Sequence, residues 1–170
     1  MNLMILDGNS IVNRAFYGVR PLNAPDGTPT NAVYGFLAIL QRLLDEQKPD
    51  ALCVSFDLKA PTFRHRAYEG YKAQRKAMPE ELALQMPVLK EVLDKMGIRR
   101  YELEGYEADD ILGTLARRAE SENIEAYVLT GDRDSLQLIS DRVRVLLATN
   151  TDTVTMDRQA FFESKGIQPE

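Results

Sequence analysis

The chain has 170 residues, of which 44% are hydrophobic and 28% are charged, and this size and mixture predict one globular domain with a sizeable core. The net charge of -5 argues against a uniformly basic nucleic-acid-binding surface, but residues 64–76 carry five basic side chains against one acid, giving +4 there and -9 elsewhere. No run approaches the about 20 apolar residues that cross a bilayer, and the single cysteine excludes an internal disulfide, so we expect a cytoplasmic protein without membrane contact.

Apolar strand-like runs alternate with helical patterns along the chain. The first part predicts a strand at 3–6, a helix at 9–19, a loop rich in proline, a helix from Thr30 or Asn31 to about Glu46, and a strand at 52–56. The rest predicts a helix from Pro79 to Gly97, a strand at 98–101, a helix at 108–122, a strand at 126–129, a short helix through Ile139, a strand at 143–148, an extended segment at 151–155 and a helix near 157–164. This alternation predicts an α/β fold with a mostly parallel central sheet flanked by helices.

Two helical patterns carry apolar stripes that predict core packing, and in the helix that ends near Glu46 the stripe consists of Val33, Phe36, Leu37, Leu40, Leu43 and Leu44. In the helix at 79–97 the stripe consists of Leu82, Met86, Leu89, Leu93 and Met96, at steps of three and four residues. Residues 58–78 lack such a stripe and are basic and rich in tyrosine and arginine. We therefore expect them to project from the domain, either as a solvated surface loop or as a gate for single strands, where Tyr68 and Tyr71 stack on bases.

Four of the predicted strands are followed by acidic side chains. These acids are Asp7, Asp57, Glu107, Asp109, Asp110, Asp132 and Asp134. Because the carboxyl ends of parallel strands meet at one edge, we expect all seven to converge there. Turns and helix caps explain each acid taken alone, but a single cap does not explain the three acids between 107 and 110. The set predicts bound cations, which offset the repulsion among gathered carboxylates.

The residue types restrict the metal. The one histidine, His65, is far in sequence from the acids, and Cys53 lies within a strand, so a zinc site of the His and Cys kind has no ligands. Oxygen ligands favour Mg²⁺, for which Mn²⁺ can substitute. Two such ions about 4 Å apart support hydrolysis of a phosphodiester without a side-chain nucleophile.

The chain also resembles a known family on several stretches that run in family order over nearly its whole length. The matching stretches are 6–10 with 14–17, 30–36, 56–57 with 63–65, 71–75, 105–110 and 130–134 with 137–138. They are similar to the 5′-nuclease domain at the N-terminus of bacterial DNA polymerase I, in the flap endonuclease and 5′-3′ exonuclease family with a PIN-like fold.

The resemblance implies roles for particular residues. The seven acids correspond to the family's metal ligands, with two ions expected in the complete site. Residues 58–78 correspond to a helical arch that passes a 5′ single strand. Within the arch, Tyr71, Lys72 and Arg75 match the family pattern and Arg64 is expected to bind DNA. Lys72, Arg75 and Arg14 are expected to act on the phosphate.

The resemblance also implies partners and a context. The expected substrate is DNA with a 5′ flap, a nick or a single-stranded 5′ end, which is cleaved in primer removal and repair. The protein is expected to be a monomer, and in a longer parent protein it is expected to be linked to a polymerase portion. We expect residues 1–170 to form the N-terminal PIN-like domain, without the helix-hairpin-helix region that follows it in the family.

The sequence is also compatible with other functions. One is a catalytically weak module that binds metal and flaps without turnover, and another is a PIN-type ribonuclease, because nothing in the sequence reads the 2′-hydroxyl. A phosphoryl-acceptor enzyme with Asp7 as nucleophile is disfavoured, since that chemistry places a second acid where this chain has Asn9.

Overall fold

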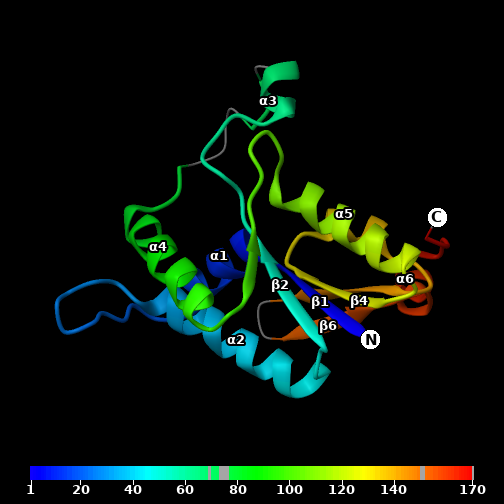
Figure 1. The fold of residues 1–170 in the computed structure, drawn as a ribbon, viewed down its shortest axis with the longest axis horizontal. Coiled ribbons are helices and arrows are strands. Elements are labelled where there is room, and N and C mark those ends of the chain that lie inside the picture. The colour runs from blue at the N-terminus through cyan, green and yellow to red at the C-terminus, as the bar shows by residue number, and fades with distance from the viewer. Residues whose placement is uncertain (69, 73–76, 150–151, 170) are drawn as a thin grey trace.

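The computed structural model describes residues 1–68, 70–72, 77–149 and 152–169, and within them it shows one six-stranded sheet between two layers of helices (Figure 1). The strands are β1 (Asn2–Asp7), β2 (Ala51–Ser55), β3 (Arg99–Tyr101), β4 (Glu125–Thr130), β5 (Val143–Ala148) and β6 (Thr153–Met156). The helices are α1 (Gly8–Gly18), α2 (Asn31–Gln47), α3 (Phe63–Ala67), α4 (Glu80–Lys95), α5 (Ala108–Ser121), the 3₁₀ helix η1 (Arg133–Leu138) and α6 (Arg158–Lys165).

The sheet has the strand order β3-β2-β1-β4-β5-β6. The pairings from β3 through β5 are parallel, and β6 pairs with β5 in the antiparallel direction. This confirms the predicted mostly parallel sheet. The central strand β1 is in register with both neighbours, Leu6 lying opposite Val54 and Leu129, so the carboxyl ends of β1, β2 and β4 lie together at one edge.

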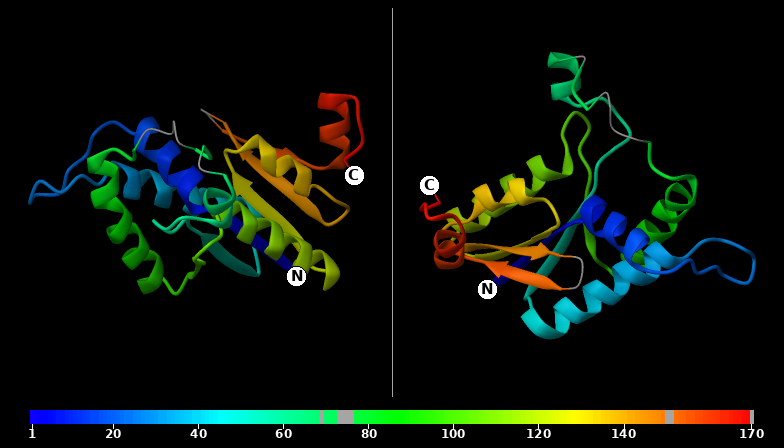
Figure 2. Two further views of the ribbon diagram at one scale, coloured as in Figure 1. Left: turned by 90° about the horizontal axis from the view of Figure 1, so that it is seen from above. Right: turned by 180° about the vertical axis from the view of Figure 1, so that it is seen from behind.

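Each face of the sheet packs against its own set of helices. In β1, Met4 and Leu6 belong to a core cluster shared with α1, α2 and α4, whereas Ile5 belongs to a cluster shared with α5 and η1. Figure 2 shows α1, α2 and α4 on one side of the strands and α5 on the other. Alternate side chains of a strand point to opposite faces, so a strand buried on both faces is apolar throughout.

A buried amide joins α4 to the start of α2. Gln85 has no exposed surface, and its carbonyl oxygen accepts hydrogen bonds from the backbone N–H groups of Ala32 and Val33, at 2.8 and 3.2 Å. Its amide nitrogen donates to Asn31 Oδ1 at 2.9 Å, and Asn31 in turn donates to two carbonyl groups near the end of α1. Because the first N–H groups of a helix have no partner within it, Gln85 fixes α4 by satisfying two of them.

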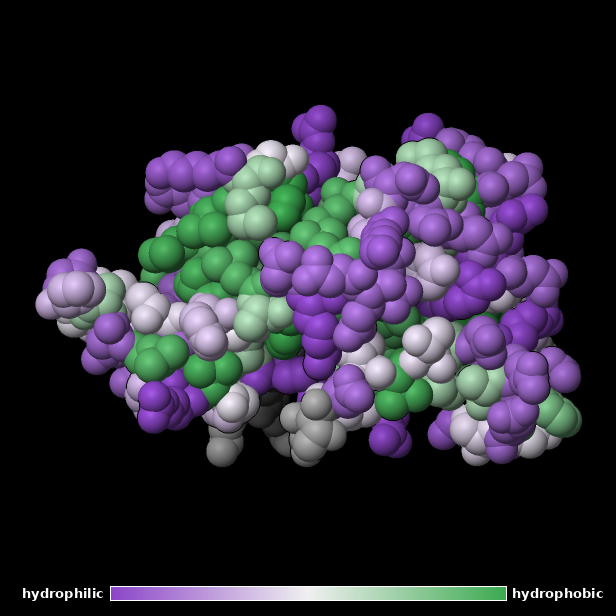
Figure 3. Space-filling view, turned by 90° about the horizontal axis from the view of Figure 1, so that it is seen from below, coloured by the Kyte–Doolittle hydropathy of each residue, from purple (hydrophilic) through white to green (hydrophobic). Residues whose placement is uncertain are grey.

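The predicted helices and strands all occur, with shifts of one or a few residues at their ends. The apolar stripe of α4 is buried at Leu82, Leu89 and Leu93, and Met86 is partly buried. Its last member is a correction: Met96 is 51% exposed, because α4 ends at Lys95 and the chain turns away at Gly97. Figure 3 shows apolar side chains gathered on the surface where α2 and α4 lie.

Within the predicted projecting segment, the structure describes residues 58–68, 70–72 and 77–78. They include the short helix α3, which projects beyond the sheet in Figure 1. Residues 69 and 73–76 lie outside the described residues, and the predicted arch residue Arg75 is among them. No helix in the described ranges is long and apolar enough to cross a membrane.

Candidate active site

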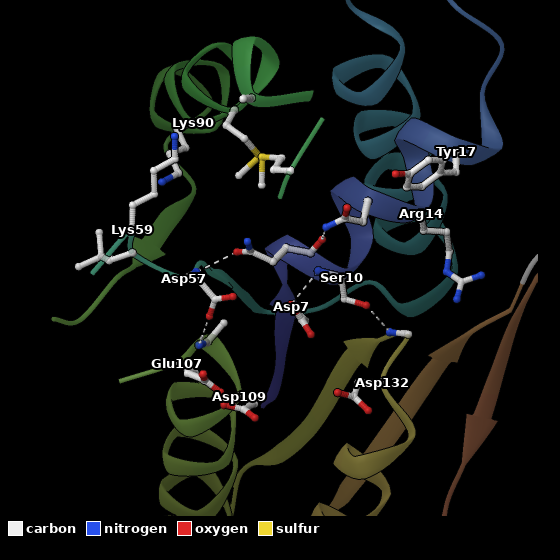
Figure 4. A pocket seen from close by; sticks show the side chains of 18 of the residues that line it. Asp7, Ser10, Arg14, Tyr17, Asp57, Lys59, Lys90, Glu107, Asp109 and Asp132 are labelled. Carbon is white, nitrogen blue, oxygen red and sulfur yellow. Dashed lines mark hydrogen bonds between the residues drawn. The ribbon is translucent and has the colours of Figure 1, made fainter. Parts of the chain in front are cut away.

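An open pocket of about 1480 Å³ lies at the carboxyl edge of the sheet. Its walls come from α1, the loop after β2, α4, the start of α5 and the loop after β4 (Figure 4). Five of the seven predicted acids line this pocket: Asp7, Asp57, Glu107, Asp109 and Asp132. Asp110 and Asp134 do not line it, Asp110 being turned toward the arch and Asp134 lying exposed in η1.

Asp7 lies at the centre of the pocket and is only 8% exposed. Its Oδ1 caps α1 by accepting a hydrogen bond from the Ser10 N–H at 2.9 Å, and its Oδ2 accepts one from the Thr130 hydroxyl at 2.9 Å. Burial raises the pKa of Asp7 to about 6, against these two hydrogen bonds, and the charges of Asp57 and Asp132 act in the same direction as burial. An acid held in this way gains strongly from a nearby cation.

Asp57 connects three elements at the pocket edge. Its backbone N–H donates to Asn9 Oδ1 at 2.8 Å, and its Oδ1 accepts the N–H of Ala108, the first residue of α5, at 2.7 Å. These bonds hold the end of β2 against both α1 and α5. They leave the second carboxylate oxygen of Asp57 without a hydrogen bond from another described residue.

Two cationic side chains from the predicted arch, Arg64 and Lys72, reach the acids at the start of α5. Lys72 Nζ lies 2.9 Å from Glu107 Oε2, and the Tyr71 hydroxyl donates to the same oxygen at 3.0 Å. Arg64 binds Asp110 through two hydrogen bonds of 2.7 and 2.6 Å. Three residues of the predicted arch, Arg64, Tyr71 and Lys72, therefore contact two of the predicted metal ligands; Tyr71 and Lys72 are called the arch base below.

These contacts change the pKa values of the groups involved. The Arg64 guanidinium holds the pKa of Asp110 below its usual value, and hydrogen bonding to Asp110 raises the pKa of Arg64 further. Burial lowers the pKa of Lys72, but the hydrogen bond and charge of Glu107 outweigh it and raise that pKa overall. Burial, followed by the charges of Asp110 and Glu107, raises the pKa of Asp109.

The donor atoms suit a hard divalent cation, because the pocket offers carboxylate oxygens and neither histidine nor cysteine lines it. Within the described ranges, no three acidic, histidine or cysteine side chains are arranged closely enough to hold a metal as they stand. Two of the predicted ligands are engaged in ion pairs, Glu107 with Lys72 and Asp110 with Arg64. A divalent ion therefore fits the donor chemistry of the pocket, which Glu107 already lines and Asp110 does not.

Cationic side chains lie on both walls of the pocket, and an aromatic one lies on the α1 wall. Arg14 and Tyr17 come from α1, and Tyr17 is 72% exposed. The guanidinium of Arg14 lies close against the backbone at Gly131, where a Cβ atom would stand 2.9 Å from Nη2. On the opposite wall are Lys59 and Lys90, so the acids lie between two groups of positive charge (Figure 4).

No role in the site was assigned from the sequence to several polar residues that shape the pocket. Asn9, Ser10 and Thr130 all hydrogen-bond to a predicted ligand or to the chain beside one. The available signal was their position, since each is a small polar residue next to the end of a buried strand. Lys90 gave no such signal, because it occupies the polar face of a helix that was interpreted only as core packing.

Comparison with known proteins gives one family match and several close relatives. The family model described as 5′-3′ exonuclease, N-terminal resolvase-like domain, matches residues 2–166. DNA polymerase I of Bacillus subtilis (strain 168) is 44% identical over 170 residues, and the thermostable DNA polymerase I of Thermus thermophilus is 43% identical over 168. Each alignment covers 99% of this chain but only 19% and 20% of those proteins, so the chain spans about a fifth of the length of these relatives.

Solved structures share the fold. The T5 5′-exonuclease with bound zinc has a TM-score of 0.72 at 20% identity, covering 98% of this chain and 62% of that one. The bacteriophage T5 D15 flap endonuclease, in a pseudo-enzyme-product complex with DNA and metal ions, has a TM-score of 0.71 at 20% identity, covering 98% and 61%. At this level of identity the likeness establishes a common PIN-like α/β fold.

Proposed function

The chain belongs to the 5′-3′ exonuclease family, as its N-terminal resolvase-like domain, and from that membership we propose that it hydrolyses DNA phosphodiesters at 5′ ends and flaps with the help of divalent metal ions. One observation carries the proposal. Five carboxylates from the ends of three parallel strands and the start of α5 line one pocket, and Tyr71 and Lys72 are hydrogen-bonded to Glu107 at its rim.

The acids are proposed to hold two Mg²⁺ ions, with Mn²⁺ able to replace them. Asp7, Asp57, Glu107, Asp109 and Asp132 line the pocket already, Asp110 directly follows Asp109 in sequence, and Asp134 comes two residues after Asp132. Divalent ions bound there lower the pKa of water and offset the negative charge of the reacting phosphate. The carboxylates of the chain fix where that charge is placed.

The basic residues are proposed to position the DNA. Arg14 on α1 faces the pocket from one side, and Lys72 at the arch base lies at its rim, so both can bind the phosphate that is cleaved. Arg64 and Tyr71 are proposed to engage the single strand after they release Asp110 and Glu107. Arg75 has the same proposed role from the resemblance alone, since it lies outside the described residues.

The wider context is also a proposal. We infer that the chain acts as a monomer in the cytoplasm, in primer removal and repair, and that in a longer parent it is linked to a polymerase portion, as in its DNA polymerase I relatives. Residues 1–170 would then be one PIN-like domain with an arch at about 58–78.

Cleavage of a 5′-labelled flap DNA tests the proposal. We expect product with Mg²⁺ or Mn²⁺, none with EDTA, and a loss of at least about a hundredfold in rate for Asp109→Asn, which removes a ligand from the exposed rim of the pocket. The matched control is Asp26→Asn, an exposed acid in the loop before α2, which should cleave at the parent rate. Cleavage that survives EDTA, or an unchanged rate in Asp109→Asn, would contradict the metal assignment.

A second candidate function rests on the ion pairs of the predicted arch residues. Because Glu107 and Asp110 are held by Lys72 and Arg64, the chain can act as a module that binds metal and flaps without turnover. Gel-shift binding of the same flap in Ca²⁺, together with no product in Mg²⁺, would favour this module. Product in Mg²⁺ would exclude it.

A further inference from the structure

A buried hydroxyl connects two of the pocket acids that come from different strands. Thr130, the last residue of β4, has no exposed surface. Its hydroxyl donates to Asp7 Oδ2 at 2.9 Å and accepts the backbone N–H of Asp132 at 3.0 Å. One side chain thus touches the acid at the end of β1 and the backbone that carries the acid after β4.

A second contact closes the same junction. The Ser10 backbone N–H donates to Asp7 Oδ1, and the Ser10 hydroxyl accepts the Gly131 N–H at 2.8 Å. Both oxygens of Asp7 are therefore fixed by donors from the protein, one from α1 and one from β4. Three hydrogen bonds, from Thr130 to Asp7, from Ser10 to Asp7 and from Gly131 to Ser10, form a closed ring with the backbone between Thr130 and Gly131, so Asp7 cannot rotate without breaking one of them.

We propose that Thr130 is a positioning residue that sets the separation and orientation of Asp7 and Asp132 for a divalent cation. The inference rests on the proposed function, because it takes these two acids as metal ligands. Hydrogen-bond partners of metal ligands commonly change metal affinity by about 10- to 100-fold when they are removed. Thr130 suits this role because its hydroxyl donates its one proton to Asp7 and offers a lone pair to the Asp132 backbone.

The alternative is that Thr130 serves only to hold β4 in the fold. Substitution by valine distinguishes the two roles, because the valine side chain has nearly the shape of threonine but neither donates nor accepts a hydrogen bond. Thr130→Val keeps the packing and removes both contacts, whereas Thr130→Ser keeps a hydroxyl and loses a methyl group. Val145→Ala provides a matched control, since it is a fully buried position on the neighbouring strand β5 whose side chain does not line the pocket.

The experiment is Mn²⁺ binding to the full chain, followed by electron paramagnetic resonance of the free ion, without DNA and without any activity measurement. Urea unfolding in EDTA is measured on the same samples. We expect Thr130→Val to raise the Kd for Mn²⁺ by about tenfold or more, Thr130→Ser to stay within about threefold of the parent, and Val145→Ala to bind like the parent although it is less stable.

The outcomes separate this inference from the proposed function. A parent chain that binds no Mn²⁺ would overturn the metal site, and the role of Thr130 with it. A parent that binds Mn²⁺, with Thr130→Val binding equally well, would overturn the positioning role alone. The positioning role also fails if Val145→Ala weakens binding as much as Thr130→Val, because affinity would then follow stability. If Thr130→Val does not fold, Thr130→Ala carries the same comparison.

Discussion

Replacing Asp7 by asparagine should stabilise the metal-free protein at neutral pH and have less effect in acid. The native state holds the proton of Asp7 up to pH about 6, whereas the unfolded chain releases it near 3.8. Between these values the native state binds more protons than the unfolded state, so the free energy of unfolding falls as the pH rises. At about 1.4 kcal/mol per pH unit, the ionised carboxylate costs the native state about 3 kcal/mol at pH 7.

The measurement is urea unfolding in EDTA, followed by circular dichroism, at several pH values from about 4 to 7.5. We expect the stability of Asp7→Asn relative to the parent to increase by about 2 to 3 kcal/mol across this range. The hydrogen bonds that asparagine changes contribute a constant offset, so the slope against pH isolates the carboxylate.

Asp26→Asn provides a control of opposite sign. Hydrogen bonds from Thr28 lower the pKa of the exposed Asp26, so its stabilising effect is present above pH about 4 and is lost only as the pH falls below it. Parallel stability curves for Asp7→Asn and the parent would refute the reasoning, since they would show that Asp7 titrates alike in both states. Added Mg²⁺ should stabilise the parent more than Asp7→Asn at pH 7.5.

Three further substitutions test the packing and the arch contacts. Gly8→Ala would bring a Cβ atom to 2.4 Å from the ring of the buried Phe56, so urea unfolding should show a loss of about 1–3 kcal/mol in the free energy of unfolding. This loss should be smaller when Phe56→Leu is also present, and additive effects of the two substitutions would contradict the clash. Gln85→Leu leaves two N–H groups at the start of α2 without an acceptor, so the same assay should show a loss of about 2 kcal/mol or more in the free energy of unfolding. Parent-like stability would show that Gln85 does not fix α4 against α2. Lys72→Met frees Glu107 for a cation, so the Kd for Mn²⁺ should fall by about two- to fivefold, whereas weaker binding would mean that Lys72 does not compete with the metal.

Periodicity predicted the parts of this fold that depend on local sequence. The parallel sheet and the edge that carries the acids followed from apolar runs that each ended in a carboxylate, and the placement of Asp7, Asp57 and Asp132 around one pocket agrees with that reasoning. The helix α3, in the segment predicted to project, lies beyond the sheet, in a stretch with few aliphatic residues to anchor it to the core.

The directions of individual side chains depended on contacts that are distant in sequence. Asp110 follows the same strand as Asp109 but is drawn out of the pocket by Arg64, 46 residues earlier in the chain. The role of Thr130 likewise needs Asp7, which lies 123 residues away. No local pattern encodes such pairs, so the sequence predicted which acids gather at the edge but not which of them face the pocket.

The central place of β1 has a consequence for how the chain folds during its synthesis. β1 needs β2 on one side and β4 on the other, and Thr130 at the end of β4 comes 75 residues after Ser55 at the end of β2. A ribosome adds about 5 to 20 residues per second, so β1 waits about 4 to 15 s with one edge unpaired. The part of the sheet made by then already carries Asp7 and Asp57, and the set of acids that lines the pocket is complete only when Asp132 has emerged from the ribosome.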